Sequence, residues 1–245
     1  MTSGEGPEPH DVRSSLGRNL THGMLDALGR AIVTGVYTDK RFPTEADLAS
    51  QHGVSRSVTR EAVKMLTAKG LLSARPRQGT IVQPAESWNL FDADVLGWLL
   101  ERKFSLGLLR HFSELRIAIE PAAAELAARN AGAGGLVAIR AGYARMVAAE
   151  AGEDDSLDAD IAFHVAILRA AGNPFFAQFE DVVTTALRSS IRFTNRFKGR
   201  SADLAAHGSV LRAIEARDGL AAQHAMQQII ADVLALILAR EHDDT

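Results

Sequence analysis

The stretch GVSRSVTREAVKMLTAKGLL, residues 53–72, decides the fold of the N-terminal part of this chain. Its cationic residues recur at every fourth position and would form one stripe along a helix: Arg56, Arg60 and Lys64. Its apolar residues stand two positions away, about 200° around the helix, and form a second stripe: Val58, Ala62 and Leu66. We therefore expect a helix that buries one face and keeps the opposite face charged.

The residues around this stretch add four further elements. A helix is predicted from about Arg18 to Val33, and a short helix follows, with Thr44 as its N-cap and Gly53 as its stop signal. Ser55 caps the helix with the charged stripe, which ends at Gly70. Two strands, LLSA and TIVQ, flank the basic turn RPRQG. The order helix, helix, tight turn, helix and two-stranded ribbon predicts a winged helix-turn-helix.

This fold predicts contact with DNA. The second helix of a helix-turn-helix enters the major groove, and its N-terminal residues reach base edges. Arginine suits bidentate recognition of guanine, whereas hydroxyls and helix N-terminal amides suit phosphate. The predicted DNA-binding residues are Thr44, Ser55, Arg56, Ser57, Thr59, Arg60, Lys64, Arg75, Arg77 and Gly79. The alternative, an amphipathic helix with a solvated basic face, leaves the turn and the ribbon unexplained.

The composition agrees with two domains of different tasks. The chain has 245 residues, of which 47% are hydrophobic, enough for one large or two modest domains. Residues 10–84 carry 11 Lys and Arg against 6 Asp and Glu, whereas residues 85–245 carry 16 against 22. A basic first third joined to an acidic remainder suggests that one task involves a polyanion. Cysteine is absent, which excludes disulfides and thiolate metal sites.

The N-terminus shows no targeting signal. No apolar run there has the form of a signal peptide, and no uninterrupted apolar stretch reaches roughly 18 residues. We expect a soluble cytoplasmic protein without a membrane partner. Residues 1–10 are polar and rich in Gly and Pro, so we expect a disordered tail there, followed by the DNA-binding domain at 11–84.

Residues 85–245 show only helical periodicity. Glycine-rich breaks divide them into about seven amphipathic stretches. The sequence therefore predicts an all-α antiparallel bundle with short loops. We expect the alanine-rich face around Ala122–Ala128 to supply the contact between two chains.

Four polar residues interrupt the apolar pattern of the bundle. Arg116 lies on the border of a buried stripe, and His207 stands early in a later helix. Asp160 and His164 are four residues apart, so their side chains meet on one helical face, beside the apolar stripe. Charged groups are rarely placed there without a partner. Structural roles stay open: an ion pair of Arg116 with Glu120, a surface Asp–His pair and a capping histidine.

The winged domain resembles a known family. The segment FPTEADLASQHGVSRSVTREAVKMLTAKGLLSARPRQGTIV, residues 42–82, is similar to the DNA-binding domain of the GntR family of bacterial regulators. The resemblance implies that Arg56, Arg60 and the wing glycine Gly79 contact operator DNA. Family members often carry Arg after the Glu of the second helix, where this chain has Ala46, so we expect one contact to be missing.

The helical part resembles the effector domain of the FadR subgroup of that family, the FCD domain. The similarity lies in ELRIAIEPAAAELAA, DADIAFHVAILRAAGNP and HGSVLRAIEARDGLAAQHAM. It implies a divalent metal, Zn²⁺ foremost, bound by Asp160, His164 and His207. The fourth ligand position of the family is Ile229 here, which cannot ligate, and His224 is displaced by roughly 140° around the helix. Water or an acid ligand would complete the shell. In the alternative, His164 and His207 hydrogen-bond the effector without a metal.

Within the subgroup, the chain is similar to regulators of sugar-acid catabolism of the galactonate-responsive type. The similarity lies in SWNLFDADVLGWLLE at the domain junction and in the missing histidine. A carboxylate effector would suit Arg116, because a planar guanidinium binds carboxylates bidentately. The predicted effector-binding residues are Arg116, Asp160, His164, Arg188, Ser189 and His207.

Together these features predict a ligand-responsive transcription regulator that binds a palindromic operator as a homodimer, with residues 85–245 serving effector binding and dimerisation. A repressor released by a small carboxylic or sugar acid is favoured over an activator. A helical metalloenzyme is the rival from another class, but the E-x-x-H motifs of di-iron bundles are absent after residue 84. A helical interaction module would leave the wing unexplained.

Overall fold

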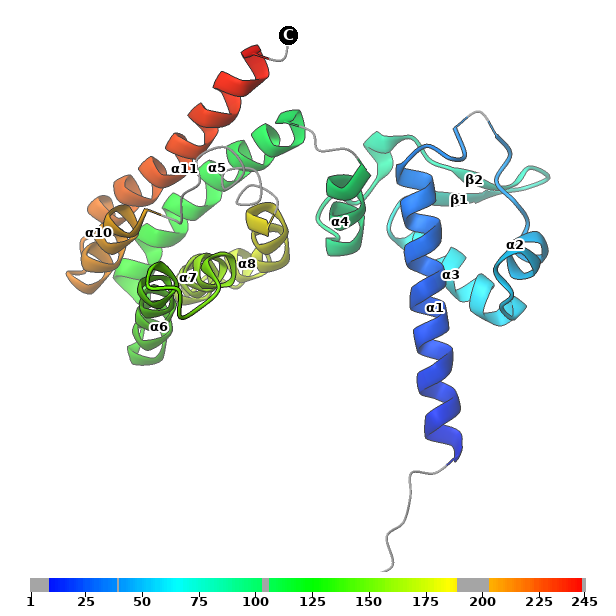
Figure 1. Ribbon diagram of the computed structural model, residues 1–245, viewed down its shortest axis with the longest axis horizontal. Coiled ribbons are helices and arrows are strands. Elements are labelled where there is room, and N and C mark those ends of the chain that lie inside the picture. Colours follow the sequence, from blue (N-terminus) through cyan, green and yellow to red (C-terminus); the bar gives the residue numbers. More distant parts are fainter. Residues whose placement is uncertain (1–8, 39, 103–105, 189–202, 244–245) are drawn as a thin grey trace, which may run out of the picture. The chain divides into compact units, whose positions relative to one another are not determined.

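The structure is a computed structural model that describes residues 9–38, 40–102, 106–188 and 203–243. The chain divides into two compact units, residues 1–103 and 104–245 (Figure 1). Each unit has its own hydrophobic core. The predicted fold class is confirmed, since a winged helix-turn-helix is followed by a helical bundle. Residues 1–8 of the expected tail lie outside the described residues.

The first unit contains three helices before its hairpin. These are α1 (Pro9–Val33), α2 (Glu45–His52) and α3 (Arg56–Ala68). Helix α1 begins at Pro9, earlier than the predicted start near Arg18, and proline suits the first position of a helix because its missing N–H would be unpaired there anyway. Apolar residues of α1 and α3 form the core of this unit, among them Leu25, Leu28, Ala62 and Leu66.

Helix α2 begins and ends where the sequence predicts. The Thr44 hydroxyl accepts a hydrogen bond from the Asp47 N–H at 3.2 Å, and the Asp47 carboxylate accepts one from the Thr44 N–H at 3.1 Å. This capping box satisfies two backbone donors of the first turn. Gly53 closes the helix with φ 64°, in the left-handed region that favours glycine. Ser55 then caps α3, accepting from the Val58 N–H at 3.3 Å.

The ribbon is an antiparallel hairpin of β1 (Leu72–Arg75) and β2 (Gly79–Val82). Leu72 pairs with Val82 and Arg75 pairs with Gly79, so each strand is shifted by one residue from its predicted place. The shift leaves only three residues in the turn, because the hairpin ladder extends up to Arg75 and Gly79 themselves.

The first unit also includes α4 (Ala93–Arg102), which the sequence analysis placed in the helical domain. Trp98 is buried, and its indole Nε1 donates to Asp26 Oδ1 of α1 at 2.7 Å. A Cβ at Gly29 would lie 2.4 Å from the Trp98 ring, so glycine makes room for the indole. Lys69, the C-cap of α3, binds Asp92 and Asp94 at the start of α4 with Nζ–O distances of 2.6 and 2.8 Å. The division therefore falls at 103/104 instead of 84/85.

The second unit is built from long helices and one short one. The bounds are α5 (Leu106–Asn130), α6 (Ala133–Glu150), α7 (Ser156–Ala170), α8 (Pro174–Ala177), α10 (Leu204–Glu215) and α11 (Gly219–Asp243). Residues 180–188 are also helical. Helices α5 and α11 lie side by side (Figure 1).

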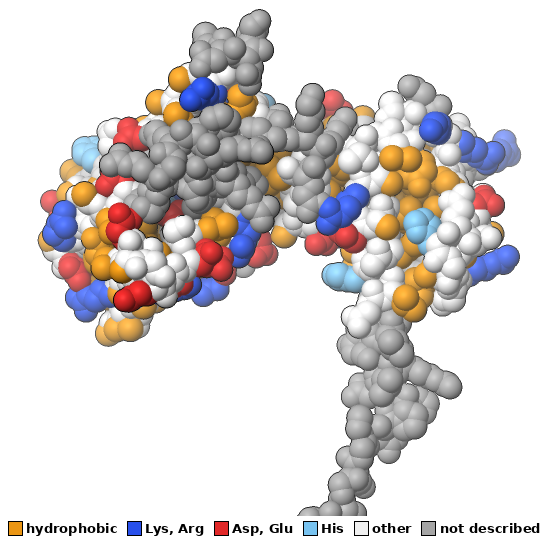
Figure 2. All heavy atoms as spheres, in the orientation of Figure 1, with side chains coloured by type: hydrophobic (Ala, Val, Ile, Leu, Met, Phe, Trp, Pro, Cys, Tyr) orange, Lys and Arg blue, Asp and Glu red, His pale blue; other side chains and the backbone are white. Residues whose placement is uncertain are grey.

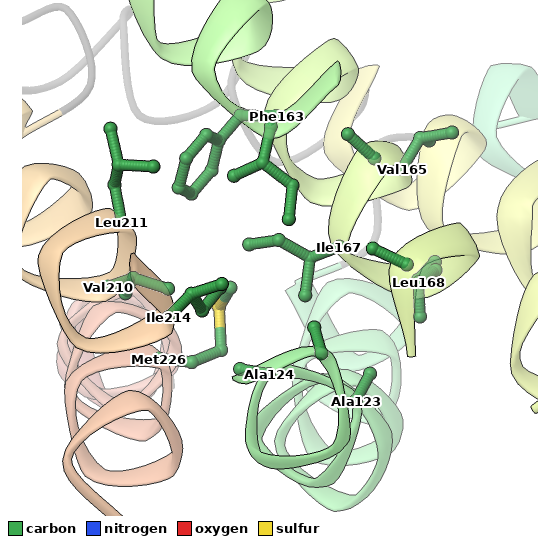
Figure 3. Close-up of a cluster of buried hydrophobic side chains, with 14 of the residues drawn as sticks. Ala123, Ala124, Phe163, Val165, Ile167, Leu168, Val210, Leu211, Ile214 and Met226 are labelled. Carbon is green, nitrogen blue, oxygen red and sulfur yellow. The ribbon is translucent and has the colours of Figure 1, made fainter. Parts of the chain in front are cut away.

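The core of this unit lies between α5, α7, α10 and α11, where Phe163, Ile167, Ile214 and Met226 meet (Figure 3). Ala123 and Ala124 point into the same core, and Ala127 and Ala128 are buried as well. The alanine-rich face is thus covered within one chain, and the prediction that it joins two chains is wrong. Helix α11 has the length and composition of a membrane-spanning helix, and 22% of its most apolar stretch is buried in the folded unit. Its fully buried positions include Ala222, Met226, Ile230 and Ile237.

Candidate functional site

The first unit exposes basic and hydroxyl side chains on α3 and on the hairpin. Helix α3 exposes Arg56, Ser57, Arg60 and Lys64, and the hairpin exposes Arg75, Arg77 and Gly79. Figure 2 shows Lys and Arg side chains standing out from the edge of the unit that carries α2 and the hairpin. The opposite side of α3 is buried in the core through Ala62, Val63 and Leu66. The two faces predicted for this helix are therefore present.

Two of the exposed cations contact carboxylates of the same unit. Arg60 donates through Nε to Glu45 Oε2 at 3.2 Å, and Lys64 Nζ lies 3.9 Å from Glu61 Oε2. Exposed ion pairs of this kind contribute at most about 1 kcal/mol. A phosphate or a guanine edge can therefore compete for either cation at little cost. The sequence pattern gives no indication of the contact with Glu45, which lies 15 residues away from Arg60.

One predicted DNA contact is wrong. Thr59 is fully buried, and its hydroxyl donates to the Ser55 carbonyl one turn earlier at 3.3 Å. Thr59 stands beside Ala62, Val63 and Leu66 in the buried stripe, whereas Val58 is only partly buried. Thr44 and Ser55 remain exposed, but their hydroxyls cap α2 and α3.

The wing turn holds two residues in the left-handed region. Arg77 has φ 64° and Gly79 has φ 81°. A non-glycine residue there costs on the order of 1–3 kcal/mol, and such strain concentrates at functional positions. No atom lies within 4 Å of a Cβ built on Gly79, so the backbone conformation, and not crowding, favours glycine there.

The second unit buries five ionisable side chains that contact one another. They are 1–4% exposed and come from three helices: Arg116 and Glu120 of α5, Asp160 and His164 of α7, and His207 of α10. We call this set the buried cluster. Arg116 pairs with Glu120 at an Nε–Oε1 distance of 2.5 Å, as the structural alternative in the sequence analysis proposed. The alternative of a surface Asp–His pair is wrong, because both residues are buried.

Each histidine of the buried cluster has one ring nitrogen engaged by an acceptor. His207 Nδ1 donates to the Asp203 carbonyl at 2.7 Å, and His164 Nδ1 contacts the Glu120 carboxylate. A neutral imidazole carries one proton, so these acceptors place it on Nδ1 in both rings. Both Nε2 atoms are then unprotonated. They lie 3.3 Å apart, and His207 Nε2 lies 3.1 Å from Asp160 Oδ1.

Three lone pairs thus converge in one buried place. The third separation, between His164 Nε2 and Asp160 Oδ1, is 3.8 Å. Ligands of a tetrahedral zinc ion at about 2.0–2.1 Å stand about 3.3 Å from one another. The distances within Asp160, His164 and His207 match that spacing, and neutral imidazole with carboxylate is a donor set that Zn²⁺ accepts.

Without a cation, a proton must lie between Asp160 Oδ1 and the Nε2 atoms of the two histidines. Burial lowers the pKa of His207, but Asp160 and the Asp203 carbonyl outweigh burial, and the pKa lies above its ordinary 6.5. Burial raises the pKa of Asp160, but the two histidines bring it below its ordinary value. For Glu120, burial is outweighed by Arg116 and His164, which hold the pKa at about 2. The cluster is therefore built to hold positive charge between Asp160 and the two histidines.

The remaining predicted effector and metal positions lie elsewhere. Arg188 is half exposed and pairs with Asp158 at 2.9 Å. Ser189 lies outside the described residues. Ile229 is partly buried and packs against the core, and His224 is exposed, so neither belongs to the buried cluster. The described donor set comprises Asp160, His164 and His207, which are the three ligands predicted from the sequence.

Glu120 is the member of the buried cluster that the sequence analysis missed as a functional residue. Its spacing of four from Arg116 indicated an ion pair, but its contact with His164 spans 44 residues of sequence. The signal in the sequence was a second charged residue on the same border of a buried stripe.

Comparison with known proteins identifies both units. Residues 21–82 match the bacterial regulatory proteins of the gntR family, and residues 111–232 match the FCD domain. The galactonate operon transcriptional repressor of Escherichia coli K12 is 33% identical over 87% of this chain and 94% of its own length. The uncharacterized regulator YieP of the same organism is 32% identical over 87% and 93%. The regulator LutR of Bacillus subtilis is 28% identical over 76% and 86%.

These relatives are transcription regulators, not enzymes, and the first two match along 87% of the chain. The order of a GntR-type winged helix and an FCD domain is the order of the two units described above. The chain is therefore a DNA-binding transcription regulator of the GntR family, in the FadR-like group that carries an FCD effector domain.

Proposed function

We propose that this regulator is a homodimeric repressor of a catabolic operon, which binds a palindromic operator in the cytoplasm and leaves it when a small carboxylic or sugar acid binds in the second unit. The name of the galactonate operon repressor, 33% identical, supports both the repressor role and the class of effector. Two-fold symmetry of the protein would match two half-sites of DNA.

On the DNA side, the proposal assigns base and phosphate contacts to the exposed residues of α3 and the wing. Arg56, Ser57 and Arg60 stand on the first turns of α3, which is the part of a recognition helix that reaches base edges. The remaining assigned contacts, mainly to phosphate, are Thr44, Ser55, Lys64, Arg75, Arg77 and Gly79.

On the effector side, the observation that carries the proposal is the convergence of Asp160 Oδ1, His164 Nε2 and His207 Nε2 in one buried place, at mutual distances of 3.1, 3.3 and 3.8 Å. Asp160, His164 and His207 would hold one divalent cation, Zn²⁺ in the first instance, and Ile229 leaves the fourth position to water or effector. When bound, the cation would supply a Lewis-acidic centre for an acid or hydroxyl oxygen. Without the cation, neutral histidines could accept a hydrogen bond from an effector hydroxyl through Nε2, but they could not donate one to a carboxylate oxygen, because their protons on Nδ1 are already donated.

Arg116 would bind the effector carboxylate. A guanidinium has five N–H donors, and Glu120 accepts from Nε and Nη2, with 3.5 Å for the second contact. Among the described residues, no other acceptor binds this guanidinium, and the proposal assigns its remaining donors to a second carboxylate. An effector that binds one state of the dimer better than another then shifts the population of DNA-competent molecules.

The experiment uses the full chain with Arg116→Ala and His164→Ala. Each variant should remain a dimer that binds operator, but sugar acids should no longer release it. Arg129→Ala is the matched control, because Arg129 forms an i,i+4 pair with Glu125 on the exposed side of the same helix. Elemental analysis should find about one divalent ion per chain, lost in Asp160→Ala. A metal-free protein that still responds would replace the cation with direct hydrogen bonds between the effector and the histidines, and a response surviving both substitutions would refute the effector site.

A further inference from the structure

Glu120 has an unusual position for a carboxylate that is not one of the three converging donors. Its side chain is 1% exposed, at the end of an ion pair that is itself buried. Oε1 accepts from Arg116 Nε, and Oε2 contacts both Arg116 Nη2 and His164 Nδ1. A buried carboxylate is costly unless its oxygens are paired, and here both oxygens are. The ion pair with Arg116 would be complete without His164, so the contact with the imidazole calls for an explanation.

The contact with Glu120 determines which nitrogen of His164 carries the proton. A carboxylate accepts and does not donate, so His164 must present an N–H at Nδ1. Its Nε2 then presents a lone pair toward His207 Nε2 and Asp160 Oδ1. If the proton moved to Nε2, the set of three donors would lose one member. His207 is held in the same tautomer by the Asp203 carbonyl, which no side-chain substitution removes.

We infer that Glu120 is a positioning residue of the cation site, one that fixes the tautomer and ring orientation of His164 and links the site to Arg116. The inference rests on the cation site proposed above. Carboxylates behind metal-binding histidines orient the ring and strengthen the ligand, and their removal costs about 10- to 100-fold in affinity. The Glu120 carboxylate contacts both Arg116 and His164. An anion that binds Arg116 therefore also changes the hydrogen bond between Glu120 and the His164 imidazole.

The test measures Co²⁺ and Zn²⁺ binding to the full-length protein by competition with a chromophoric chelator at fixed pH. Glu120→Gln keeps the side-chain volume and removes the charge, and we expect its dissociation constant to rise by about 10- to 100-fold. Glu125→Gln is the matched control. Glu125 also belongs to an i,i+4 pair on α5, but its partner Arg129 is exposed and the pair lies away from the cluster, so affinity should not change.

Two further measurements separate positioning from general structural support. Long-range ¹H–¹⁵N spectra of histidine-labelled protein should show His164 as the Nδ1–H tautomer in the wild type, and a mixture of tautomers in Glu120→Gln. Arg116→Met should leave the metal affinity unchanged, because the Glu120 carboxylate still accepts the hydrogen bond from His164 Nδ1. If Glu120→Gln fails to fold, the double variant Arg116→Met/Glu120→Gln removes both charges of the pair, and it should show the same loss.

The results discriminate between the two proposals. Stoichiometric binding by the wild type with an unchanged dissociation constant in Glu120→Gln would overturn the role of Glu120 and leave the cation site standing. A wild-type protein that takes up neither Co²⁺ nor Zn²⁺ would overturn the cation site itself. A lower melting temperature of metal-free Glu120→Gln with unchanged metal affinity would show that Glu120 serves the fold alone.

Discussion

Arg60 and Lys64 stand one turn apart on the same exposed stripe, yet we expect them to fail in different ways when replaced by alanine. Arg60 is held through Nε by Glu45, which leaves its two Nη groups for the O6 and N7 acceptors of a guanine. Lys64 makes only a loose contact of 3.9 Å with Glu61, and an ammonium group suits a phosphate as a point charge.

The expected magnitudes follow from these roles. Loss of a bidentate base contact costs about 1–3 kcal/mol per half-site, so Arg60→Ala in a dimer should cost about 2–6 kcal/mol, at least roughly 30-fold in affinity. That loss should be confined to duplexes with the preferred base. Lys64→Ala should weaken operator and scrambled DNA alike, and it should reduce the slope of log K against log salt by about 2, one phosphate for each subunit.

Fluorescence anisotropy over a salt series measures both effects, with duplexes obtained by in vitro selection using the wild-type protein. Glu45→Gln serves as a companion variant, because it removes the partner of Arg60 without removing the guanidinium. Equal losses on operator and scrambled DNA for Arg60→Ala would refute base recognition by this residue. Unchanged affinity for both Arg56→Ala and Arg60→Ala would refute the whole assignment of α3 as the recognition helix.

Three further predictions concern stability and assembly. Trp98→Ala should lower the stability of the first unit by about 3–5 kcal/mol, because the indole is buried, whereas Trp98→Phe should cost less, because it keeps an aromatic ring and loses the hydrogen bond to Asp26 and part of the packing. Calorimetry of the full chain measures both losses, and a loss confined to the second unit would contradict the docking of α4. The metal-free protein should be most stable near pH 5–6.5. The raised pKa of His207 gives stability that is complete below pH 6.5 and lost as the pH rises through the folded value, whereas the lowered pKa values of Asp160 and Glu120 give stability that is lost as the pH falls below about 4. Urea denaturation across this range should show a loss of stability on both sides, and His207→Gln should reduce the loss on the alkaline side. Light scattering should give twice the 26.3 kDa of one chain at micromolar concentration, and a monomer there would contradict the proposed homodimer.

The local features of the first unit could be predicted from the sequence because their causes are local. Thr44 with Asp47 and Ser55 with Val58 are contacts over three residues, and Gly53 ends α2 through its own φ angle. Thr59 was misplaced for a physical reason. Its hydroxyl donates a hydrogen bond to the Ser55 carbonyl, so this polar residue can lie in the buried stripe without leaving a buried polar group unpaired.

The features that the sequence analysis misjudged depend on contacts far apart in the chain. Trp98 contacts Asp26 across 72 residues of sequence, and nothing in the periodicity of residues 93–102 indicates that this helix packs against α1. Glu120 meets His164 across 44 residues. The alanine-rich face of α5 was assigned to a partner chain because a small-residue stripe looks the same whether a helix of the same chain or of another covers it.

The docking of α4 bears on how hybrid regulators can be assembled from parts of this family. A swap made after the wing, near residue 84, would separate Gly29 and Asp26 from their own tryptophan and leave Lys69 without its two carboxylates. A swap made at 103–105 keeps all of these partners on one side of the joint. A biosensor that joins the effector domain of this protein to a foreign promoter reader should therefore carry the foreign α4 with the foreign wing.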